Sequence, residues 1–376
     1  MICFAWTGFP QYAARCIRSL VDMSGEDVVV IATKPKVPID GMDALCGCEV
    51  IWIEYTETRP LVEILNGRRP SVLIVSGWKV RVFNSFRDQA KECGCKVVSM
   101  VDNNFLTGIG SRWGFRGLKL IIRESLKAIR FRCFIKRKYD AYFVPGKSGE
   151  RLLSKYGVPK NQIVHGLYSA DSALFGCVTS LSDREKKIIY VGQYVERKNV
   201  LRMVDAFAKA VKTANCMGWV LELYGSGSLR EELISKASVQ NVELKAYDAR
   251  IEVCNFTQPE QLARLYQGAR ALCLPSLEEH WGLVVHEAAL SGCALLLSRY
   301  VGASEDLLLC KGGEVINGKL FDPYDTTDMQ LAFIKFFRMT DAELGSAQRA
   351  SLEMAAKISK DGFAKSVMQI INKCKG

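Results

Sequence analysis

Short apolar runs alternate with amphipathic stretches along the first half of the chain. Six apolar runs are expected to form buried strands: Ile2–Trp6, Val28–Ala32, Val50–Tyr55, Val72–Val75, Lys96–Val101 and Ala141–Val144. Four stretches between them carry apolar residues at helical spacing: Gln11–Asp22, Pro60–Asn66, Val80–Cys93 and Gly117–Arg137. Strands that alternate with helices are typical of parallel βα units. The first half therefore predicts an α/β domain built on a parallel sheet.

The same alternation restarts in the second half, after an irregular stretch at 170–186 that is interpreted as a linker. The expected strands are Ile188–Gly192, Trp219–Tyr224, Ala271–Leu274 and Ala294–Ser298, and the expected helices are Val200–Val211, Leu229–Ala237, Gln258–Gly268 and Val284–Ser291. Two domains follow, at 1–183 and 184–376, and the last helix is free to cross back to the first. Because open parallel sheets bind ligands at the carboxyl ends of their strands, we expect a site in a cleft between the domains.

Composition limits the class of protein. The chain has 376 residues, of which 49% are hydrophobic and 24% charged, and this excludes wholesale disorder. No apolar stretch reaches the roughly 18 residues of a transmembrane helix, and no positive segment precedes the first apolar run as in a secretory signal. The 14 cysteines and three histidines form no zinc or iron–sulfur ligand pattern. We expect reduced thiols and a cytoplasmic protein.

The net charge of +11 lies entirely in the first half of the chain. Residues 1–170 hold 26 Lys and Arg against 15 Asp and Glu, whereas residues 171–376 hold 25 of each. Within 112–138 there is one acid, Glu124, and ten cations: Arg112, Arg116, Lys119, Arg123, Lys127, Arg130, Arg132, Lys136, Arg137 and Lys138. Apolar and aromatic residues are interleaved with them. Such a segment is typical of a helix on an anionic membrane surface. Nucleic acid is a competing partner, without a recognised binding motif, and a solvated helix face is the simplest alternative.

The segment from Leu274 to Ala289 carries the most specific chemistry. A buried strand ends at Pro275, a polar loop follows, and an amphipathic helix begins near Gly282. Glycine lets the backbone approach a ligand closely, and amides at a helix start attract an anion such as a diphosphate. Glu279 in the loop and Glu287 one turn into the helix suit a ligand rich in hydroxyls, because a carboxylate accepts two hydrogen bonds from a diol. A solvated acidic loop before a core helix remains the alternative.

The spacing from Glu279 to Glu287 resembles the E-x7-E motif of retaining glycosyltransferases of GT-B fold, and of glycosyltransferase family 4 in particular. Tyr190–Asn199 resembles the G-R-L-x-x-x-K-G segment of that family. Three further blocks are similar in order and distance: Tyr224–Gly227, Asn255–Phe256 with Pro259–Leu262, and Val301–Ala303. The resemblance covers about residues 186–325 and implies two Rossmann-like parallel-sheet domains that face a cleft.

The resemblance also implies roles for single residues. Glu287 would hold the nucleotide ribose, Glu279 a hydroxyl of the donor sugar, and Lys198 the diphosphate together with the amides of Gly282, Leu283 and Val284. His280, inside the same loop, would contact the sugar or phosphate. Asn255 and Phe256 belong to a further donor-binding block. The arginine that the family usually has in the first block is Gln193 here, so one cation is missing. Arg197 is a candidate replacement, and Asn199 stands at the position of a family glycine, where a left-handed conformation is tolerable.

In the first domain, Gly8 follows the first strand, where the family has a glycine-rich loop, although a plain strand-to-helix turn fits as well. The family places a polar residue that faces the transferred sugar after a later strand. Asp102 is the candidate here, with Asn103 behind it, and an Asx-capped loop is the alternative.

These features predict a cytoplasmic enzyme, peripheral to the inner face of the membrane, that transfers a sugar with retention from a nucleotide-sugar donor to a glycan acceptor. The basic first domain favours an anionic acceptor such as a polyprenyl-diphosphate-linked glycan in polysaccharide biosynthesis. The chain has no Asp-x-Asp pair of the kind that holds a divalent metal, so we expect no metal and no other cofactor. A sugar-nucleotide epimerase of the same fold and a basic nucleic-acid-binding protein are the alternatives.

Overall fold

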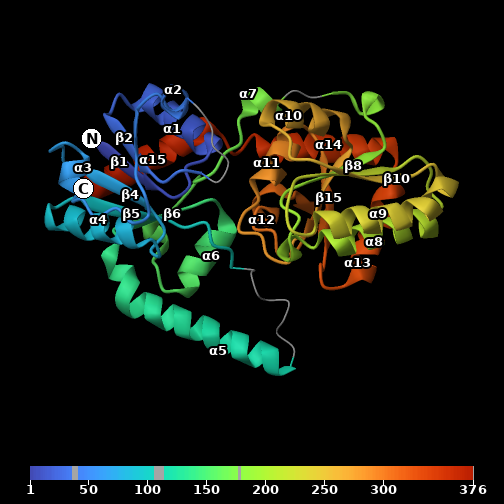
Figure 1. Ribbon diagram of the computed structural model, residues 1–376, viewed down its shortest axis with the longest axis horizontal. Helices are drawn as coiled ribbons and strands as arrows, with labels where there is room; N and C mark the ends of the chain where they lie inside the picture. Colours follow the sequence, from blue (N-terminus) through green and yellow to red (C-terminus); the bar gives the residue numbers. More distant parts are fainter. Residues whose placement is uncertain (36–40, 106–113, 177–178, 376) are drawn as a thin grey trace. The chain divides into compact units, whose positions relative to one another are not determined.

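The computed structural model describes residues 1–35, 41–105, 114–176 and 179–375. The chain forms two compact units (Figure 1). The first unit holds Met1–Phe105, Gly114–Ser169 and the segment from Ile358 onward, and the second holds Ala170–Lys357. Each is built on its own parallel sheet covered by helices, which confirms the predicted class of two parallel-sheet α/β domains.

The first sheet has seven strands, all paired in parallel. Their order across the sheet is β3 (Glu49–Trp52), β2 (Val28–Ala32), β1 (Ile2–Trp6), β4 (Val72–Ser76), β5 (Lys96–Met100), β6 (Ala141–Val144) and β7 (Ile163–His165). The central strands β1 and β2 are fully buried, as continuous apolar runs covered on both faces require. Six of the seven strands match the sequence prediction, and the three-residue edge strand β7 was missed.

Helices cover both faces of this sheet. They are α1 (Gln11–Ser24), α2 (Met42–Cys46), α3 (Leu61–Ile64), α4 (Arg81–Glu92), α5 (Gly114–Arg130), α6 (Lys147–Lys155) and the C-terminal α15 (Lys360–Lys375). α1 and α15 pack on one face, and α3, α4 and α6 contribute to the core on the other. Phe363 of α15 lies against Phe4 and Phe143, with ring centroids 6.2 and 5.4 Å away. The last helix is therefore part of the core of the first unit.

The basic segment forms α5 and continues through a π-helical turn (Phe131–Ile135) into a 3-10 turn (Lys136–Lys138). One face is anchored, because Ala128 and Phe131 are buried in the core of the first unit. The opposite face carries an exposed apolar stripe: Ile122, Leu126, Ile129 and Phe134 are 51, 61, 55 and 69% exposed. Amphipathic surface helices normally turn their apolar stripe toward the core. Here part of it faces outward, so this helix has an unpartnered apolar side.

The second sheet has six parallel strands. Their order is β10 (Arg250–Cys254), β9 (Val220–Tyr224), β8 (Lys187–Val191), β11 (Ala271–Leu274), β12 (Ala294–Ser298) and β15 (Gly318–Phe321). The main helices are α8 (Val200–Ala214), α9 (Arg230–Leu244), α10 (Pro259–Gly268), α11 (Leu283–Leu290), α13 (Thr326–Phe337) and α14 (Asp341–Ala355). Short helices α7 (Ser172–Phe175) and α12 (Ser304–Leu307) and the hairpin β13–β14 (Cys310–Lys311, Glu314–Val315) complete the unit.

The stretch interpreted as a linker is packed in its described part. Asp171 caps α7 by accepting a hydrogen bond from the Ala173 amide at 3.1 Å. Arg184 is 3% exposed and donates to the carbonyl of Ala269 at 2.8 Å. A buried guanidinium needs several acceptors, which the ends of α10 and α11 supply through their last carbonyls. The stretch thus belongs to the second unit.

Strand order determines where each sheet can bind a ligand. In the first sheet the direction in which successive strands are added changes between β1 and β4, and in the second it changes between β8 and β11. The loops that leave two such neighbouring strands diverge and leave a crevice at the carboxyl edge. The residues after β1, β4, β8 and β11 are therefore the ones to inspect.

Candidate functional site

An ion pair joins the two loops that diverge in the second unit. After β8 the chain makes a 3-10 turn (Glu196–Lys198), and after β11 it enters the polar loop that precedes α11. The Lys198 ammonium contacts the Glu279 carboxylate, and the Ser276 hydroxyl donates to the same carboxylate at 3.2 Å. Lys198 is only 8% exposed. The structure thus brings together Lys198 and Glu279, and it adds Ser276, which the sequence did not single out.

Asn199 holds this lysine loop in place. Its φ of 58° lies in the left-handed region, as expected for a position where the resembling family has glycine. Its side-chain amide donates to the carbonyls of Pro275 and Pro323, at 3.3 and 2.9 Å. A glycine would adopt the same backbone without making these bonds. Asn199 therefore fastens the turn that carries Lys198 to the loop that carries Glu279.

Three glycines allow the loops after β8 and β9 to cross with their backbones in direct contact. A Cβ on Gly225 would lie 1.9 Å from the Gly192 carbonyl oxygen, and one on Gly227 would lie 2.4 Å from that of Tyr194. The Tyr194 amide donates to the Ser226 carbonyl at 2.8 Å across the crossing. These glycines act by close packing of backbone, and they fix the path of the loop that contains Gln193.

The start of α11 presents unpaired backbone donors. Gly282, with φ of 94°, turns the chain into the helix. The amides of Leu283 and Val284 have no intrahelical acceptor, as in every helical first turn, and none is found elsewhere among the described residues. A Cβ on Gly282 would lie 3.2 Å from Cγ of Glu279, so the helix start adjoins the ion pair. His280 lies in the same loop with its side chain 47% exposed.

Glu287 lies one turn into α11, where the Tyr266 hydroxyl donates to its carboxylate at 3.2 Å. Burial raises the pKa of Glu287 to about 7, although the hydrogen bond from Tyr266 opposes the rise. Desolvation disfavours a carboxylate that has no cation beside it. Glu287 therefore changes its charge near neutral pH, in contrast with Glu279, which has Lys198.

The remaining donor-side candidates lie on neighbouring loops. The Arg197 guanidinium donates to the side-chain oxygen of Gln193 at 3.3 Å, so a cation stands beside the glutamine. Asn255, after β10, accepts a hydrogen bond from Arg230 at 2.8 Å. The next residue, Phe256, is 54% exposed. An exposed aromatic ring at the carboxyl edge of a sheet offers a stacking surface.

His286, the residue before Glu287, belongs to the packed interior. It is fully buried, and its Nδ1 accepts a hydrogen bond from the Ala170 amide at 3.0 Å while Nε2 lies 3.1 Å from the Ala355 carbonyl. Burial lowers the pKa of His286 to about 4, which keeps the ring neutral. It connects the first residue of the second unit to the end of α14.

The first unit has its own pocket, of about 450 Å³, at the carboxyl edge where β1 and β4 diverge. Gly8, with φ of 56°, and Asp102 both line it, together with Asn103, Thr7, Tyr12, Ser76, Trp78, Lys79 and Tyr168. The Tyr168 hydroxyl donates to Asp102 at 3.2 Å, and the Tyr12 ring meets Tyr168 edge-on. Aromatic faces beside a carboxylate and an amide suit a sugar ring and its hydroxyls.

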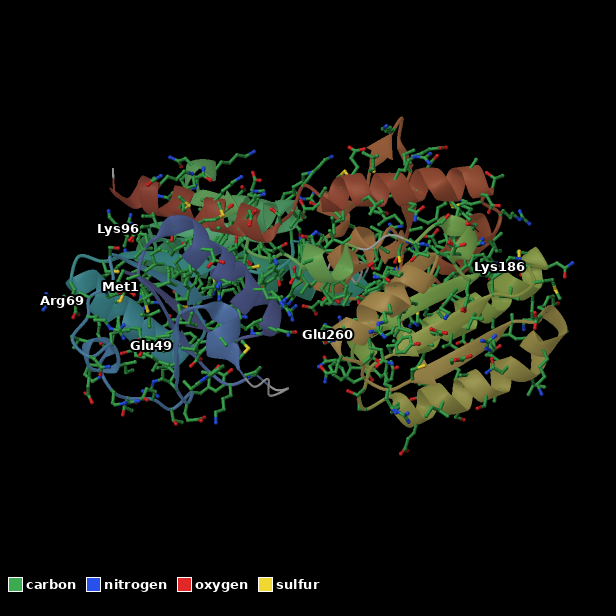
Figure 2. The ribbon with its side chains drawn as sticks, turned by 90° about the horizontal axis from the view of Figure 1, so that it is seen from above. Met1, Glu49, Arg69, Lys96, Lys186 and Glu260 are labelled. Carbon is green, nitrogen blue, oxygen red and sulfur yellow. The ribbon has the colours of Figure 1, made fainter. Side chains whose placement is uncertain are left out.

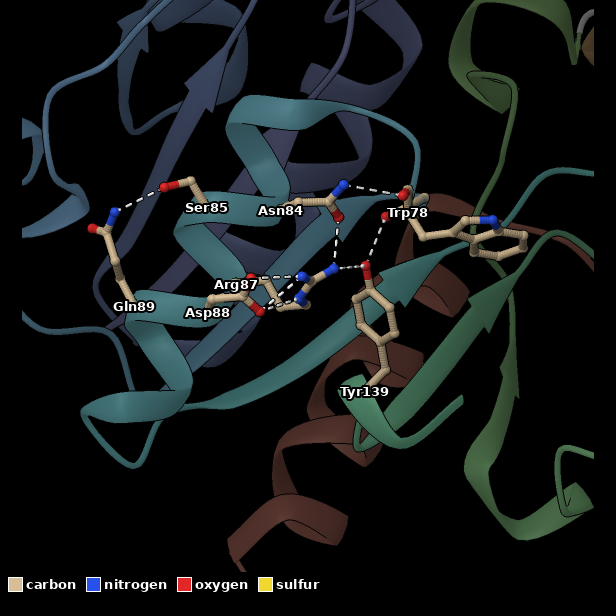
Figure 3. A network of polar contacts seen from close by, with 8 residues as sticks. Trp78, Asn84, Ser85, Arg87, Asp88, Gln89 and Tyr139 are labelled. Atoms are coloured by element: carbon tan, nitrogen blue, oxygen red, sulfur yellow. Dashed lines mark hydrogen bonds and ion pairs between the residues drawn. The ribbon is translucent and has the colours of Figure 1, made fainter. Parts of the chain in front are cut away.

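A buried polar network holds the Gly77–Trp78 part of this pocket (Figure 3). The Arg87 guanidinium, 4% exposed, donates to the Tyr139 hydroxyl and to Asn84 Oδ1, at 3.2 and 2.6 Å. Asn84 in turn donates to the Trp78 carbonyl at 3.1 Å, and Tyr139 donates to that of Gly77 at 3.3 Å. The network thus donates hydrogen bonds to two consecutive backbone carbonyls of the loop that lines the pocket. None of its residues belongs to a motif found in the sequence.

Residues 178–356 match a protein-family model described as glycosyl transferases group 1. The chain also resembles the crystal structure of Anabaena HepE in complex with UDP and glucose, with a TM-score of 0.70 at 13% identity over 99% of both chains. These findings support a GT-B glycosyltransferase. A trehalose-phosphate synthase from Burkholderia vietnamiensis, with a TM-score of 0.68 at 14% identity over 99% of this chain and 100% of that one, has the same fold.

Two curated relatives match parts of this chain. An uncharacterized glycosyltransferase of Methanocaldococcus jannaschii is 27% identical over 33% of this chain and 30% of its own length. An α-1,4-N-acetyl-D-galactosaminyltransferase of Campylobacter jejuni, named for a saccharide on PP-undecaprenol, is 23% identical over 61% of this chain and 63% of its own. The matched regions thus span less than two thirds of either relative.

Within the residues that the structure describes, the chain shows no group of three or more His, Cys, Asp or Glu side chains that could hold a metal ion. Over the same residues, no helix combines the length and apolarity needed to cross a membrane. Tyr266, Ser276 and Arg87 support site residues without belonging to any motif. The signal that could have found Ser276 is its place directly after Pro275, the predicted end of the strand.

Proposed function

We propose that this chain is a retaining glycosyltransferase that moves a sugar from a nucleotide diphosphate sugar to a lipid-linked glycan acceptor. The observation that carries the proposal is the Lys198–Glu279 pair beside the free amides that begin α11. A cation and a helix start together form a site for a diphosphate. A carboxylate directly beside that site can accept hydrogen bonds from a sugar attached to the diphosphate.

In the proposed complex, Lys198 and the amides of Leu283 and Val284 bind the diphosphate, and Glu279 binds a hydroxyl of the donor sugar. Arg197, held beside Gln193, supplies the second positive charge that a glutamine lacks. Glu287 accepts hydrogen bonds from both ribose hydroxyls. The exposed ring of Phe256, beside Asn255, offers a surface for the base.

The proposed chemistry depends on charge and position. As the bond between sugar and diphosphate breaks, negative charge grows on the leaving group and positive charge on the sugar ring. Fixed donors aimed at the leaving group lower the energy of that transition state more than that of the bound donor. Retention places the new bond on the face of the sugar from which the diphosphate leaves. The name of the Campylobacter jejuni relative specifies an α-linked product.

The acceptor side of the proposal rests on the first unit. Its pocket, with Asp102 and Gly8, offers aromatic faces and hydroxyl acceptors for a glycan. The exposed apolar stripe of α5, flanked by Arg123, Lys127 and Arg130, suits a leaflet with anionic lipids, and we place the protein at the cytoplasmic face. The PP-undecaprenol in the name of the Campylobacter jejuni relative supports a polyprenyl-linked acceptor.

A thermal-shift panel of nucleotide sugars in EDTA tests the donor part. A ligand that binds only the folded state stabilises it by RT ln(1 + [L]/Kd), so one donor should raise the unfolding temperature clearly. The Glu287→Ala variant should lose most of that rise. If no nucleotide or nucleotide sugar shifts the wild type, the donor site is wrong. If a nucleotide sugar is instead converted to its epimer without an acceptor, the enzyme is an epimerase.

A further inference from the structure

The first unit contains a second hollow, at the opposite edge of its sheet from the pocket with Asp102. This hollow, which we call the basic pocket, has a volume of about 590 Å³. The pocket lies where β5 and β6 begin, beside the segment before β7 and beside α15. Its lining residues are Lys96, Lys136, Arg137, Tyr139, Asp140, Ala141, Asn161, Gln162 and Lys373. Figure 2 labels Lys96 on the same side of the first unit as Met1, which precedes β1, and Glu49, which begins β3. None of the donor or acceptor residues proposed above lines it.

Positive charge in the basic pocket is not balanced by the protein. Four cations line it, whereas its one carboxylate, Asp140, accepts from the Val97 amide at 2.8 Å and lies 3.5 Å from Lys91. Among the described residues, Lys96, Lys136 and Arg137 make no ion pair. Lys373 donates to the Asn161 carbonyl at 3.1 Å, which leaves two of its three donor positions unassigned. Like charges held around one hollow repel each other, and an anion that enters it relieves the repulsion.

The exposed apolar stripe leads directly to this pocket along the chain. Phe134, 69% exposed, is two residues before Lys136, and Leu126 and Ile129 extend the stripe away from it. An apolar surface followed by a charged hollow matches an amphiphile with an anionic head. Basic pockets beside a membrane-facing helix bind lipid headgroups in this way, whereas a free anion would need no apolar neighbour.

We infer that the basic pocket binds the phosphate headgroup of an anionic membrane lipid, with Lys96, Lys136, Arg137 and Lys373 as its donors and the stripe of α5 in the lipid surface. This inference rests on the membrane part of the proposed function and is independent of the transfer chemistry. It assigns the first unit a lipid site separate from the pocket that contains Asp102.

Vesicle flotation of the full chain tests the inference. One variant carries Lys96→Gln, Lys136→Gln and Arg137→Gln. The matched control carries Arg123→Gln, Arg130→Gln and Lys138→Gln, which removes three charges from residues of the basic segment that do not line the pocket. Phosphatidylcholine vesicles receive phosphatidic acid or, at equal surface charge, oleate. Each cation near an anionic surface contributes about fivefold in binding, so we expect both variants to bind oleate vesicles equally weakly. On phosphatidic acid vesicles the pocket variant should bind at least about tenfold less than the control.

Equal binding of the two variants to phosphatidic acid vesicles would overturn the inference, because diffuse charge would then explain the attraction. The wild type could be displaced from the vesicles by millimolar glycerol 3-phosphate, and binding could stay unchanged after the stripe is made polar. Both results together would show that the pocket binds a free phosphate compound and would overturn the inference that it binds a lipid. A wild type that floats with neither vesicle would overturn both the inference and the membrane part of the proposal. The nucleotide-sugar thermal shift would still report on the donor site in that case.

Discussion

Lys198 and Glu279 are 81 positions apart in the chain, yet their side chains form an ion pair that is almost closed to solvent, 10 and 12% exposed. Loss of one partner from a buried pair costs about 3–5 kcal/mol, because the other charge remains desolvated. The pair therefore fixes both side chains before any ligand arrives. Preorganised charge of this kind is what a leaving diphosphate requires.

In the proposed mechanism the leaving group loses its principal cation in Lys198→Met, so we expect turnover to fall by roughly 10²–10³-fold. The same variant should be less stable by about 3 kcal/mol, because the desolvated Glu279 carboxylate loses its cation. Steady-state kinetics and denaturant unfolding measure the two effects. In the double variant Lys198→Met, Glu279→Gln, stability should recover while turnover stays low. Recovery of turnover would show that Lys198 does not act on the diphosphate.

Glu287→Gln should stabilise the free protein at pH 8 while weakening donor binding. The pKa of Glu287 is about 7 in the folded chain against an ordinary value of 4.5. Between these values the folded state retains a proton that the unfolded state has lost, so stability falls as pH rises from 4.5 to 7 and stays lower above. Glutamine removes that loss, which is at most about 3 kcal/mol.

Unfolding of wild type and Glu287→Gln at pH 5 and pH 8 checks the sign of this effect. The two proteins should differ little in free energy of unfolding at pH 5, and the variant should be the more stable one at pH 8. Calorimetry at pH 8 should show weaker nucleoside diphosphate binding, since a neutral amide cannot replace a carboxylate that accepts two hydrogen bonds, each contributing about 1.5–3 kcal/mol. Unchanged affinity in the variant would remove Glu287 from the donor site.

Transfer should continue in excess EDTA. In the proposed complex the diphosphate is bound by Lys198, Arg197 and the start of α11, so its charge is met without a divalent cation. The measurement is product formation with and without chelator at a fixed donor concentration. Activity that disappears with EDTA and returns with Mg²⁺ or Mn²⁺ would contradict this arrangement.

Arg87→Met should loosen the Gly77–Trp78 loop and raise the KM for the acceptor while donor affinity stays the same. The variant leaves Asn84 Oδ1 and the Tyr139 hydroxyl without their charged donor, which costs about 2–3 kcal/mol of stability. Ser85→Ala, on the same helix at an exposed hydrogen bond to Gln89, is the matched control and should change stability by less than about 0.5 kcal/mol. If the acceptor KM of Arg87→Met equals that of the control, the network does not contribute to acceptor binding in the pocket.

The apolar stripe of α5 can be tested apart from its charge. We expect Leu126→Ser, Ile129→Ser and Phe134→Ser together to reduce flotation with anionic vesicles strongly, because each side chain contributes about 1.5–3 kcal/mol when it leaves water. All three are more than half exposed, so thermal unfolding should change little. A large loss of stability would mean that the stripe packs on protein.

The sequence predicted the central strands well and the edges poorly. β1, β2, β6, β11 and β12 have the expected bounds, because strands buried on both faces are continuous apolar runs. β7 has three residues, and β15 and β10 lie at sheet edges with partly exposed side chains, so their apolar signal is diluted. α9 extends to Leu244, beyond the expected end at Ala237, since its polar residues continue the helix without an apolar stripe.

The sequence predicted which residues belong to the candidate site, but it did not predict which of them contact one another. Spacing and resemblance selected Glu279, Glu287 and Lys198, but only the strand order β8–β11 makes Lys198 and Glu279 partners. The elevated pKa of Glu287 depends on burial that no local pattern encodes. The Arg87 network joins α4 to Tyr139, two residues before β6, and contacts between such distant segments leave no trace in either segment alone.

The position of α15 sets the order in which this protein can be made. Phe363 fills the space between Phe4 and Phe143, so one face of the first sheet is completed by residues that a ribosome adds after all of the second unit. The described residues of the second unit all lie between Ala170 and Lys357, so this unit can fold as it emerges. The part of the chain synthesised first therefore completes its core last. Until then its apolar sheet face is available to chaperones.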